Sequence, residues 1–104
     1  MGLSQSYVMA FDKGTELMDR LPLISERMAY QEFDGEIVLF DKKGKKTFKL
    51  NRVASLIFFF CDGSHSASEI LKELIRVFPK DNPSVLSADL RQTLEHFEKE
   101  GIVR

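Results

Sequence analysis

The sequence predicts a small α+β domain in which a three-stranded antiparallel sheet precedes three helices, an arrangement related to the winged-helix class. Three observations support this prediction. Apolar residues alternate with a period of two as far as Leu50, and from there they recur with a period near 3.6. The length, 104 residues, suits a single domain with one core. We expect an N-terminal arm over residues 1–25 and the folded domain over residues 26–104.

Three strands are expected before Leu50. The first alternates over residues 28–33, as a half-buried strand does, and Asp34-Gly35 then suits a two-residue hairpin turn. The second is the β-branched and aromatic run over residues 37–40, and the third covers residues 45–50. In the turn between these two strands, Gly44 is expected to take a positive φ. The three strands form a meander with an open edge on each side.

The first helix is expected over residues 53–61, directly after the sheet. Asn51 is a favourable N-cap, and Asp62-Gly63 ends the helix because glycine tolerates the left-handed conformation. Three consecutive phenylalanines, 58–60, cannot all face one small core, since neighbouring helical residues point about 100° apart. Phe59 is therefore expected to reach a second surface, formed by the N-terminal arm, a second copy or a partner enzyme.

Two further helices follow, each with its own start and stop signals. Ser66 and Glu69 have the spacing of a capping box. The apolar face of the second helix consists of Ile70, Leu71, Leu74, Ile75 and Phe78. Asn82-Pro83 gives the usual order of a cap and a first-turn proline for the third helix. The apolar repeat of the third helix consists of Leu86, Leu90, Leu94 and Phe97. Gly101 ends this helix, and Ile102-Val103 is expected to fold back onto the core.

A set of residues running from the sheet to the last helix carries a family resemblance. The most specific segment consists of Leu50-Asn51, Ala54, Ile57-Phe58 and Asp62-Gly63 in that spacing. The other matches, in order, are Gly35, Val38-Leu39, Cys61, Glu69-Ile70, Val85, Asp89-Leu90, Leu94 and Gly101-Ile102. Over residues 27–104 the chain thus resembles the PqqD-like peptide-binding domains, or RiPP recognition elements. Phe58 stands where the family commonly has Trp, and Phe59 where it usually has a polar residue.

The resemblance implies a non-catalytic domain that captures a ribosomal precursor peptide and presents it to a modifying enzyme. In pyrroloquinoline quinone biosynthesis that partner is a radical S-adenosylmethionine enzyme. The family's peptide adds as an extra strand beside the third strand and lies in a groove shared with the third helix. The resemblance indicates the kind of module better than the pathway, so a relative that serves another peptide fits equally well.

The physical character of the third strand is compatible with the same site. An exposed sheet edge is either protected or used for pairing with another chain. Lysines at both ends of this strand either block aggregation or attract an acidic peptide. The predicted peptide-binding residues are Lys45, Lys46, Thr47, Phe48 and Lys49 of the strand, with Leu86, Asp89, Thr93 and His96 of the third helix. Of these, Leu86 fits the core better than a groove.

No catalytic site, metal site or cofactor is expected. Cys61, Asp62, His65 and His96 are the residues that such chemistry could use, but one cysteine and two scattered histidines do not make a zinc site. Cys61 ends an apolar helix, where the helix dipole disfavours a thiolate, and is interpreted as a small buried hydrophobe. The sequence contains no phosphate-binding loop, nucleophile elbow or dinucleotide fingerprint. We therefore predict that the protein is not an enzyme.

Charge bears on the two alternative functions. The net charge of −1 disfavours general binding to nucleic acid. A winged-helix DNA-binding regulator would use Lys72 and Arg76 of the second helix, but the third helix carries the acidic residues Asp89, Glu95, Glu98 and Glu100, which repel phosphate. The other alternative is an oligomeric scaffold or a homodimer, in which a second copy covers Phe59.

The compartment follows from cysteine usage and hydropathy. One cysteine permits no intrachain disulfide and favours a reducing compartment. No apolar stretch approaches the ~18 residues of a membrane span, and the start of the sequence lacks the pattern of a secretory signal. We expect a cytoplasmic protein without a membrane segment.

Overall fold

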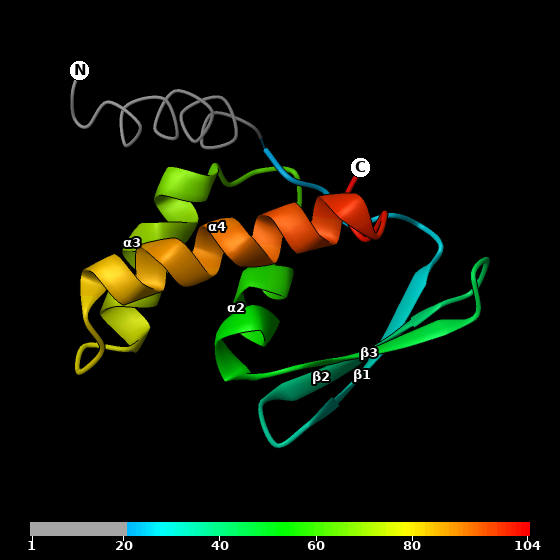
Figure 1. The fold of residues 1–104 in the computed structure, drawn as a ribbon, viewed down its shortest axis with the longest axis horizontal. Helices are drawn as coiled ribbons and strands as arrows, with labels where there is room; N and C mark the ends of the chain where they lie inside the picture. The colour runs from blue at the N-terminus through cyan, green and yellow to red at the C-terminus, as the bar shows by residue number, and fades with distance from the viewer. Residues whose placement is uncertain (1–20) are drawn as a thin grey trace.

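The computed structural model describes residues 21–104, and most of the expected N-terminal arm, residues 1–25, lies outside this part of the chain. The elements are β1 Met28–Phe33, β2 Glu36–Asp41, β3 Lys46–Leu50, α2 Arg52–Phe60, α3 Ala67–Val77 and α4 Pro83–Lys99. Figure 1 shows the sheet at one side, α4 running along the molecule beside α2, and α3 at the end away from the sheet. The predicted α+β order of three strands and then three helices is confirmed.

The sheet is an antiparallel meander of order β1-β2-β3, so both β1 and β3 are edge strands. Its register places Leu39 of β2 between Tyr30 of β1 and Phe48 of β3. The first turn has the predicted form, because Asp34 and Gly35 both take a positive φ, 56° and 81°. Two consecutive positive φ values match the twist of a two-residue hairpin.

The second turn, between β2 and β3, differs from the prediction. Lys45 takes the positive φ, 55°, in place of Gly44. The cause is Asp41, whose Oδ1 accepts hydrogen bonds from the backbone N–H groups of Lys43 and Gly44 at 3.0 and 3.1 Å. These bonds hold the first part of the turn, so the reversal of φ falls on the residue that follows Gly44.

β1 is more exposed than the half-buried strand that its alternation predicts. Met28 is partly buried, and the other five residues of the strand are exposed. The reason is tertiary, because α2 packs chiefly against β2 and β3 and leaves most of β1 outside the core. The alternation therefore correctly predicts the strand, but not its burial.

The core lies between β2 and the helices. Its largest fully buried side chains are Phe97, Ile37, Leu39, Ile57, Ile70, Leu74, Leu86, Leu90 and Ile102. The buried Ser55 hydroxyl joins α2 to two strands, since it accepts from the Ile37 N–H at 2.9 Å and donates to the Leu50 carbonyl at 3.2 Å. This link fixes where α2 begins relative to the end of β3.

The helix caps follow the sequence prediction. Asn51 accepts from the Ala54 N–H at 2.9 Å, and Asn82 accepts from the Ser84 N–H at 2.8 Å. Both bonds of the Ser66–Glu69 capping box are present. The prediction for α3 is wrong at one residue, because Ile75, expected on the buried face, is 37% exposed. Within residues 21–104, α3 packs chiefly on α2 and α4, and these two helices cover too narrow a stripe to bury Ile75.

The two ends of the described chain meet. After Gly101, with φ of 72°, Ile102 and Val103 fold back and are buried, as predicted. Val103 forms an antiparallel bridge with Ile24, and the Ser25 N–H donates to the Ile102 carbonyl at 2.8 Å. None of the helices within residues 21–104 has the length and apolar character needed to cross a bilayer.

Candidate functional site

A groove of about 480 Å³ runs between β3 and α4. Its lining residues are Thr47, Phe48, Lys49, Leu50, Asn51, Ala54, Gln92, Thr93, His96 and Phe97. β3 forms one wall, α4 forms the other, and the start of α2 closes one end. Because β3 is an edge strand, the outer side of its backbone has no strand partner within residues 21–104. Such an edge can accept main-chain hydrogen bonds from an added strand.

The α4 wall arises from helical spacing. Gln92, Thr93 and His96 lie at positions i, i+1 and i+4 and so share one face of the helix. Phe97, the next residue, is fully buried and turns its ring into the core beneath the groove. One side of α4 thus supplies polar groups at the rim, and the same helix supplies an apolar base.

An aromatic contact crosses the groove. The rings of Phe48 on β3 and His96 on α4 meet edge to face, with centroids 6.1 Å apart. The Lys46 Nζ lies 6.0 Å from the centroid of the Phe48 ring, at the outer limit of a cation–π contact. Phe48 is half-buried, so it presents apolar surface in the groove next to a histidine and a lysine.

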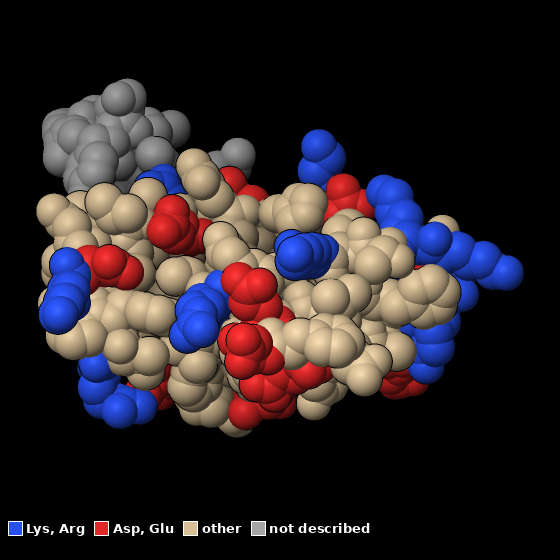
Figure 2. All heavy atoms as spheres, turned by 90° about the horizontal axis from the view of Figure 1, so that it is seen from below, with Lys and Arg blue, Asp and Glu red and all other residues tan. Residues whose placement is uncertain are grey.

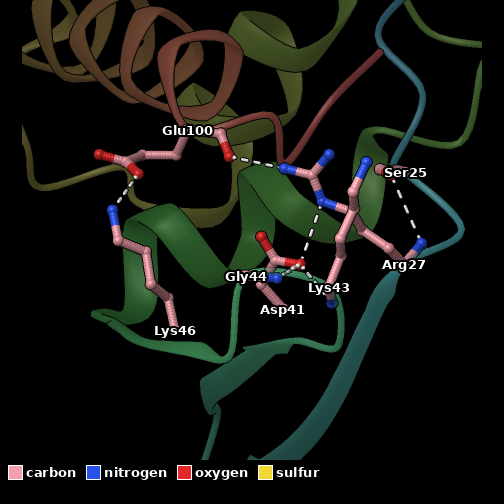
Figure 3. A network of polar contacts seen from close by, with 7 residues as sticks. All are labelled: Ser25, Arg27, Asp41, Lys43, Gly44, Lys46 and Glu100. Carbon is pink, nitrogen blue, oxygen red and sulfur yellow. Dashed lines mark hydrogen bonds and ion pairs between the residues drawn. The ribbon is translucent and has the colours of Figure 1, made fainter.

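A polar network links the first residue of β3, Lys46, to the C-terminal end of α4 (Figure 3). The Arg27 Nε donates to Asp41 at 3.1 Å, and an Nη of the same guanidinium donates to the Glu100 carbonyl at 3.2 Å. The Lys46 Nζ reaches the Glu100 carboxylate at 2.9 Å. These bonds connect Arg27 and the first residue of β3 to the C-terminal end of α4, beside the groove.

The two carboxylates of this network are held in their charged forms. The pKa of Asp41 lies below its usual value, chiefly because Gly44 donates a backbone hydrogen bond to it, with Lys43 and Arg27 adding to the effect against the opposing influence of burial. The pKa of Glu100 is also lowered, first of all by the hydrogen bond from Lys46. At neutral pH both groups are therefore anions that anchor their cationic partners.

The structure brings together five of the residues predicted from sequence to bind a peptide: Thr47, Phe48, Lys49, Thr93 and His96. Lys46 lies at the end of the groove, paired with Glu100. Lys45 lies in the turn before β3, and Asp89 is half-buried on α4 beyond the residues that line the groove.

Leu86, counted among the predicted peptide-binding residues although its spacing favoured the core, is 1% exposed and belongs to the core. Its spacing of four from Leu90 gives it the inner face of α4, not the face that borders the groove. Sequence reasoning also missed five groove residues: Leu50, Asn51, Ala54, Gln92 and Phe97. For Gln92 a signal existed, since it precedes His96 by four residues and so shares its helix face.

Cys61 is buried, as predicted, with 1% of its surface exposed. Burial raises the pKa of its thiol to about 12, and the charge of Asp62 contributes less. A thiol in this state is a poor nucleophile and a poor metal ligand. In the portion of the chain that is described, no cluster of three or more His, Cys, Asp or Glu residues could hold a metal ion.

The loop between α2 and α3 contains a compact Asp-Ser-His cluster. The same nitrogen of His65, Nδ1, lies 2.9 Å from Asp62 Oδ1 and 3.2 Å from Ser64 Oγ. A catalytic triad needs the serine and the carboxylate on opposite ring nitrogens. Here the Asp62 carboxylate also accepts from the Ser64 N–H, and its pKa is lowered, chiefly by the bond to His65. The cluster closes the turn and does not activate a hydroxyl.

Phe59 reaches the surface, as its position among three phenylalanines predicts. It is 43% exposed and packs edge to face against Tyr30 of β1.

The face of α3 suggested for DNA is partly neutralised, because the Arg76 Nε donates to Glu73 at 2.9 Å.

The family model described as Coenzyme PQQ synthesis protein D (PqqD) matches residues 36–103. One solved structure, TbiB1 in complex with the TbiA(beta) leader peptide, superposes with a TM-score of 0.70 at 21% identity, over 79% of this chain and 94% of that one. Lasso peptide synthetase B1 complexed with the leader peptide superposes with a TM-score of 0.68 at 15% identity, over 81% and 98%. At these identities the two structures show a common fold. No curated protein matches the sequence.

Proposed function

This chain belongs to the PqqD family, and from that membership we propose that it binds the leader segment of a ribosomal precursor peptide and catalyses no reaction itself. The observation that carries the proposal is the groove between β3 and α4, which combines an open strand edge with an apolar base. Two proteins of the same fold are complexed with leader peptides.

Strand addition at β3 accounts for both affinity and selectivity. An extended peptide beside β3 would form main-chain hydrogen bonds with the open edge, independent of its sequence. Alternate side chains of a strand point to opposite faces, so every second peptide residue would enter the groove and contact Phe48 and the α4 wall. The rim residues Gln92, Thr93 and His96 can hydrogen-bond the peptide and select among sequences.

The charge of the groove favours an acidic peptide. Lys49 is one of the lining residues, and the lining contains no carboxylate. Three further exposed lysines, Lys42, Lys43 and Lys45, lie in the adjoining turn. Long-range attraction of this kind mainly raises the association rate, and it weakens as salt is added.

A peptide held in this way would remain available to an enzyme. β3 has five residues and so spans about 16 Å, which accommodates only a short part of a precursor. The rest of the precursor would extend beyond the groove and could enter the active site of a modifying enzyme, which we propose to be a radical S-adenosylmethionine enzyme. The proposal includes a binding domain over residues 26–104, action in the cytoplasm and, as a further possibility to be tested by sedimentation, a homodimer.

The test uses the full-length ¹⁵N-labelled chain and the leader of a precursor peptide encoded beside its gene. We expect amide shifts concentrated in Lys46–Leu50 and on the groove side of α4, with micromolar or tighter binding. Lys49→Glu should weaken binding about tenfold at low salt because it places an anion in the groove. Lys42→Glu, a matched change in the turn outside the groove lining, should weaken it far less.

Two results would contradict the proposal. Equal losses in the Lys49 and Lys42 variants would mean that the chain attracts the peptide only by its overall charge. Shifts confined to residues 72–76 on adding duplex DNA, with none on adding the leader, would indicate a DNA-binding domain instead.

A further inference from the structure

We propose that the opposite edge of the sheet, β1, binds a basic, strand-forming segment of a partner protein. Like β3, β1 is an edge strand, and five of its six residues are exposed. Its outer backbone groups have no strand partner among residues 21–104. This edge therefore offers main-chain hydrogen bonds to an added strand, as β3 does.

An exposed aromatic cluster lies beside this edge. Tyr30 of β1 is 54% exposed and Phe59 of α2 is 43% exposed, with ring centroids 5.8 Å apart. Both rings also meet the buried ring of Phe58, at 5.2 and 5.9 Å. Because this buried ring fixes the two exposed ones in place, they form a preordered apolar contact for a side chain of the partner.

Next to the β1–β2 turn, the charge of this edge is opposite to that of the β3 side. Residues 28–41 include four acidic residues and no Lys or Arg. Asp41 is buried and bonded to Arg27, which leaves Glu32, Asp34 and Glu36 at the surface. Figure 2, which views the molecule from the side of the β1–β2 turn, shows acidic side chains gathered near the middle of this face. Lysine and arginine side chains project at the end where the β2–β3 turn lies.

One basic side chain comes near the acidic turn. A Cβ placed on Gly35 would lie 3.9 Å from the guanidinium carbon of Arg52, which projects from the start of α2. Two further basic residues, Arg27 and Lys42, lie at the other end of β1, where the Lys42 N–H donates to the Arg27 carbonyl at 2.9 Å. The acidic part of the edge is therefore the half next to the β1–β2 turn, where three surface carboxylates face Arg52. Arg52 lies at the turn and not along the strand, so it does not obstruct a segment that pairs with β1.

Charge indicates which partner fits the turn end of the edge. An acidic peptide would be repelled by the carboxylates there. A second copy paired antiparallel through β1 would place its carboxylates near Arg27 and Lys42 of the first copy, so the oligomeric state belongs among the outcomes of the test. A segment with Lys or Arg on either side of a large apolar residue is complementary to both the carboxylates and the aromatic cluster.

The two edges of the sheet can then hold two partners at once, because β2 separates them. The acidic leader would occupy β3 and the basic segment would occupy β1. The assignment of the basic segment to the modifying enzyme rests on the proposed function. The charge and shape of the β1 edge are independent of that function.

The test adds a seven-residue probe peptide to the full-length ¹⁵N-labelled chain at low salt. The probe alternates Lys with Val or Leu, and a control peptide has Glu in place of every Lys. We expect the basic probe to shift the amide signals of Met28–Phe33 and the acidic control to leave them unchanged. If the basic probe shifts none of these signals, or if both peptides shift them equally, the proposal is wrong.

Two pairs of substitutions separate local from overall charge. Glu32→Gln with Glu36→Gln should weaken binding of the basic probe about fivefold at low salt, and the loss should shrink at high salt. Asp81→Asn with Glu95→Gln removes the same charge from exposed positions away from β1 and should change binding less than twofold. Equal losses in the two variants would overturn the proposal.

Other occupants of the edge give distinct results. If the β1 amides that point away from β2 exchange slowly with solvent in the free chain, the edge is already covered by the chain itself or by a second copy. Sedimentation separates these two cases, and either one contradicts the proposal. Leader binding is read from Lys46–Leu50 in the same spectra. A failure at β1 is therefore distinguishable from a failure of the proposed function at β3.

Discussion

At the scale of single residues, the Asp41 carboxylate accepts three hydrogen bonds, more than any other side chain of the network described above. It accepts bonds from the β2–β3 turn and from Arg27, which in turn reaches the end of α4. A buried carboxylate of this kind stabilises the fold only while it is charged, because its partners are donors and a cation. The contact between Arg27 and the end of α4 is thus supported by one ionised group.

Asp41 predicts a dependence of stability on pH. Its pKa is lowered in the folded state, so its contribution is fully present above the unfolded value of 3.8 and is lost as the pH falls through the lower folded value. Asp41→Asn should therefore lower the free energy of unfolding at pH 7, and the difference from the parent chain should shrink below pH 3.8. Urea unfolding at a series of pH values measures both; a difference that is constant with pH would contradict this role.

Leu86 gives a second prediction at the same scale. Because this side chain is 1% exposed, Leu86→Ala should lower the free energy of unfolding by about 2–5 kcal/mol through lost burial and the cavity left behind. The neighbouring Val85 is 54% exposed, and Val85→Ala should cost less than about 0.5 kcal/mol. Measured on the folded protein, leader affinity should stay the same in both variants. A selective loss of affinity in Leu86→Ala would mean that this side chain contacts the peptide.

At the scale of elements, the clearest local signals are the helix caps. In the capping box of α3, the Glu69 N–H donates to Ser66 at 3.2 Å, and the Ser66 N–H donates to Glu69 at 2.8 Å. Ser66→Ala should lower the free energy of unfolding by about 1 kcal/mol. Ser68→Ala, an exposed change in the first turn of the same helix, is the control and should have little effect in the same denaturation experiment.

The elements that sequence predicts well are those whose cause lies within a few residues. Asn51, Ser66 and Asn82 cap the helices that they were predicted to cap, and Asp34-Gly35 turns the chain as expected, because each acts on its own backbone neighbours. Lys45 takes the positive φ expected of Gly44 because of hydrogen bonds to the Asp41 side chain. The side-chain chemistry of that turn overrode the simple preference of glycine.

The burial of β1 and the lining of the groove were harder to predict for a different reason. Both depend on which strand faces α2 and which side of α4 faces β3, and neither contact leaves a pattern in one segment. Alternation identified the first strand but could not show that most of it lies outside the core. Gln92 was missed for the same reason, because periodicity identifies the faces of a helix but not their partners.

At the scale of the whole molecule, the distribution of charge matters more than its sum. The net charge is −1, yet four lysines gather at residues 42–46 around the β2–β3 turn, and three surface carboxylates lie around the β1–β2 turn. An acidic leader should therefore bind more weakly as salt is raised from 50 to 500 mM, by about tenfold or more, mainly through a slower association rate. Stopped-flow kinetics would measure this, and an affinity insensitive to salt would mean that apolar contacts alone hold the peptide.

The bridge between Ile24 and Val103 has a consequence for how this unit can be combined with other proteins. Because the two ends of the described chain lie side by side, a polypeptide can enter and leave the domain at nearly the same point. A unit of this shape can be joined to an enzyme at either end, or inserted into one of its surface loops, without spreading the loop or reorganising the sheet. The geometry of the two ends therefore permits gene fusion. A linker of a few residues would attach this domain permanently to its enzyme and replace association by diffusion.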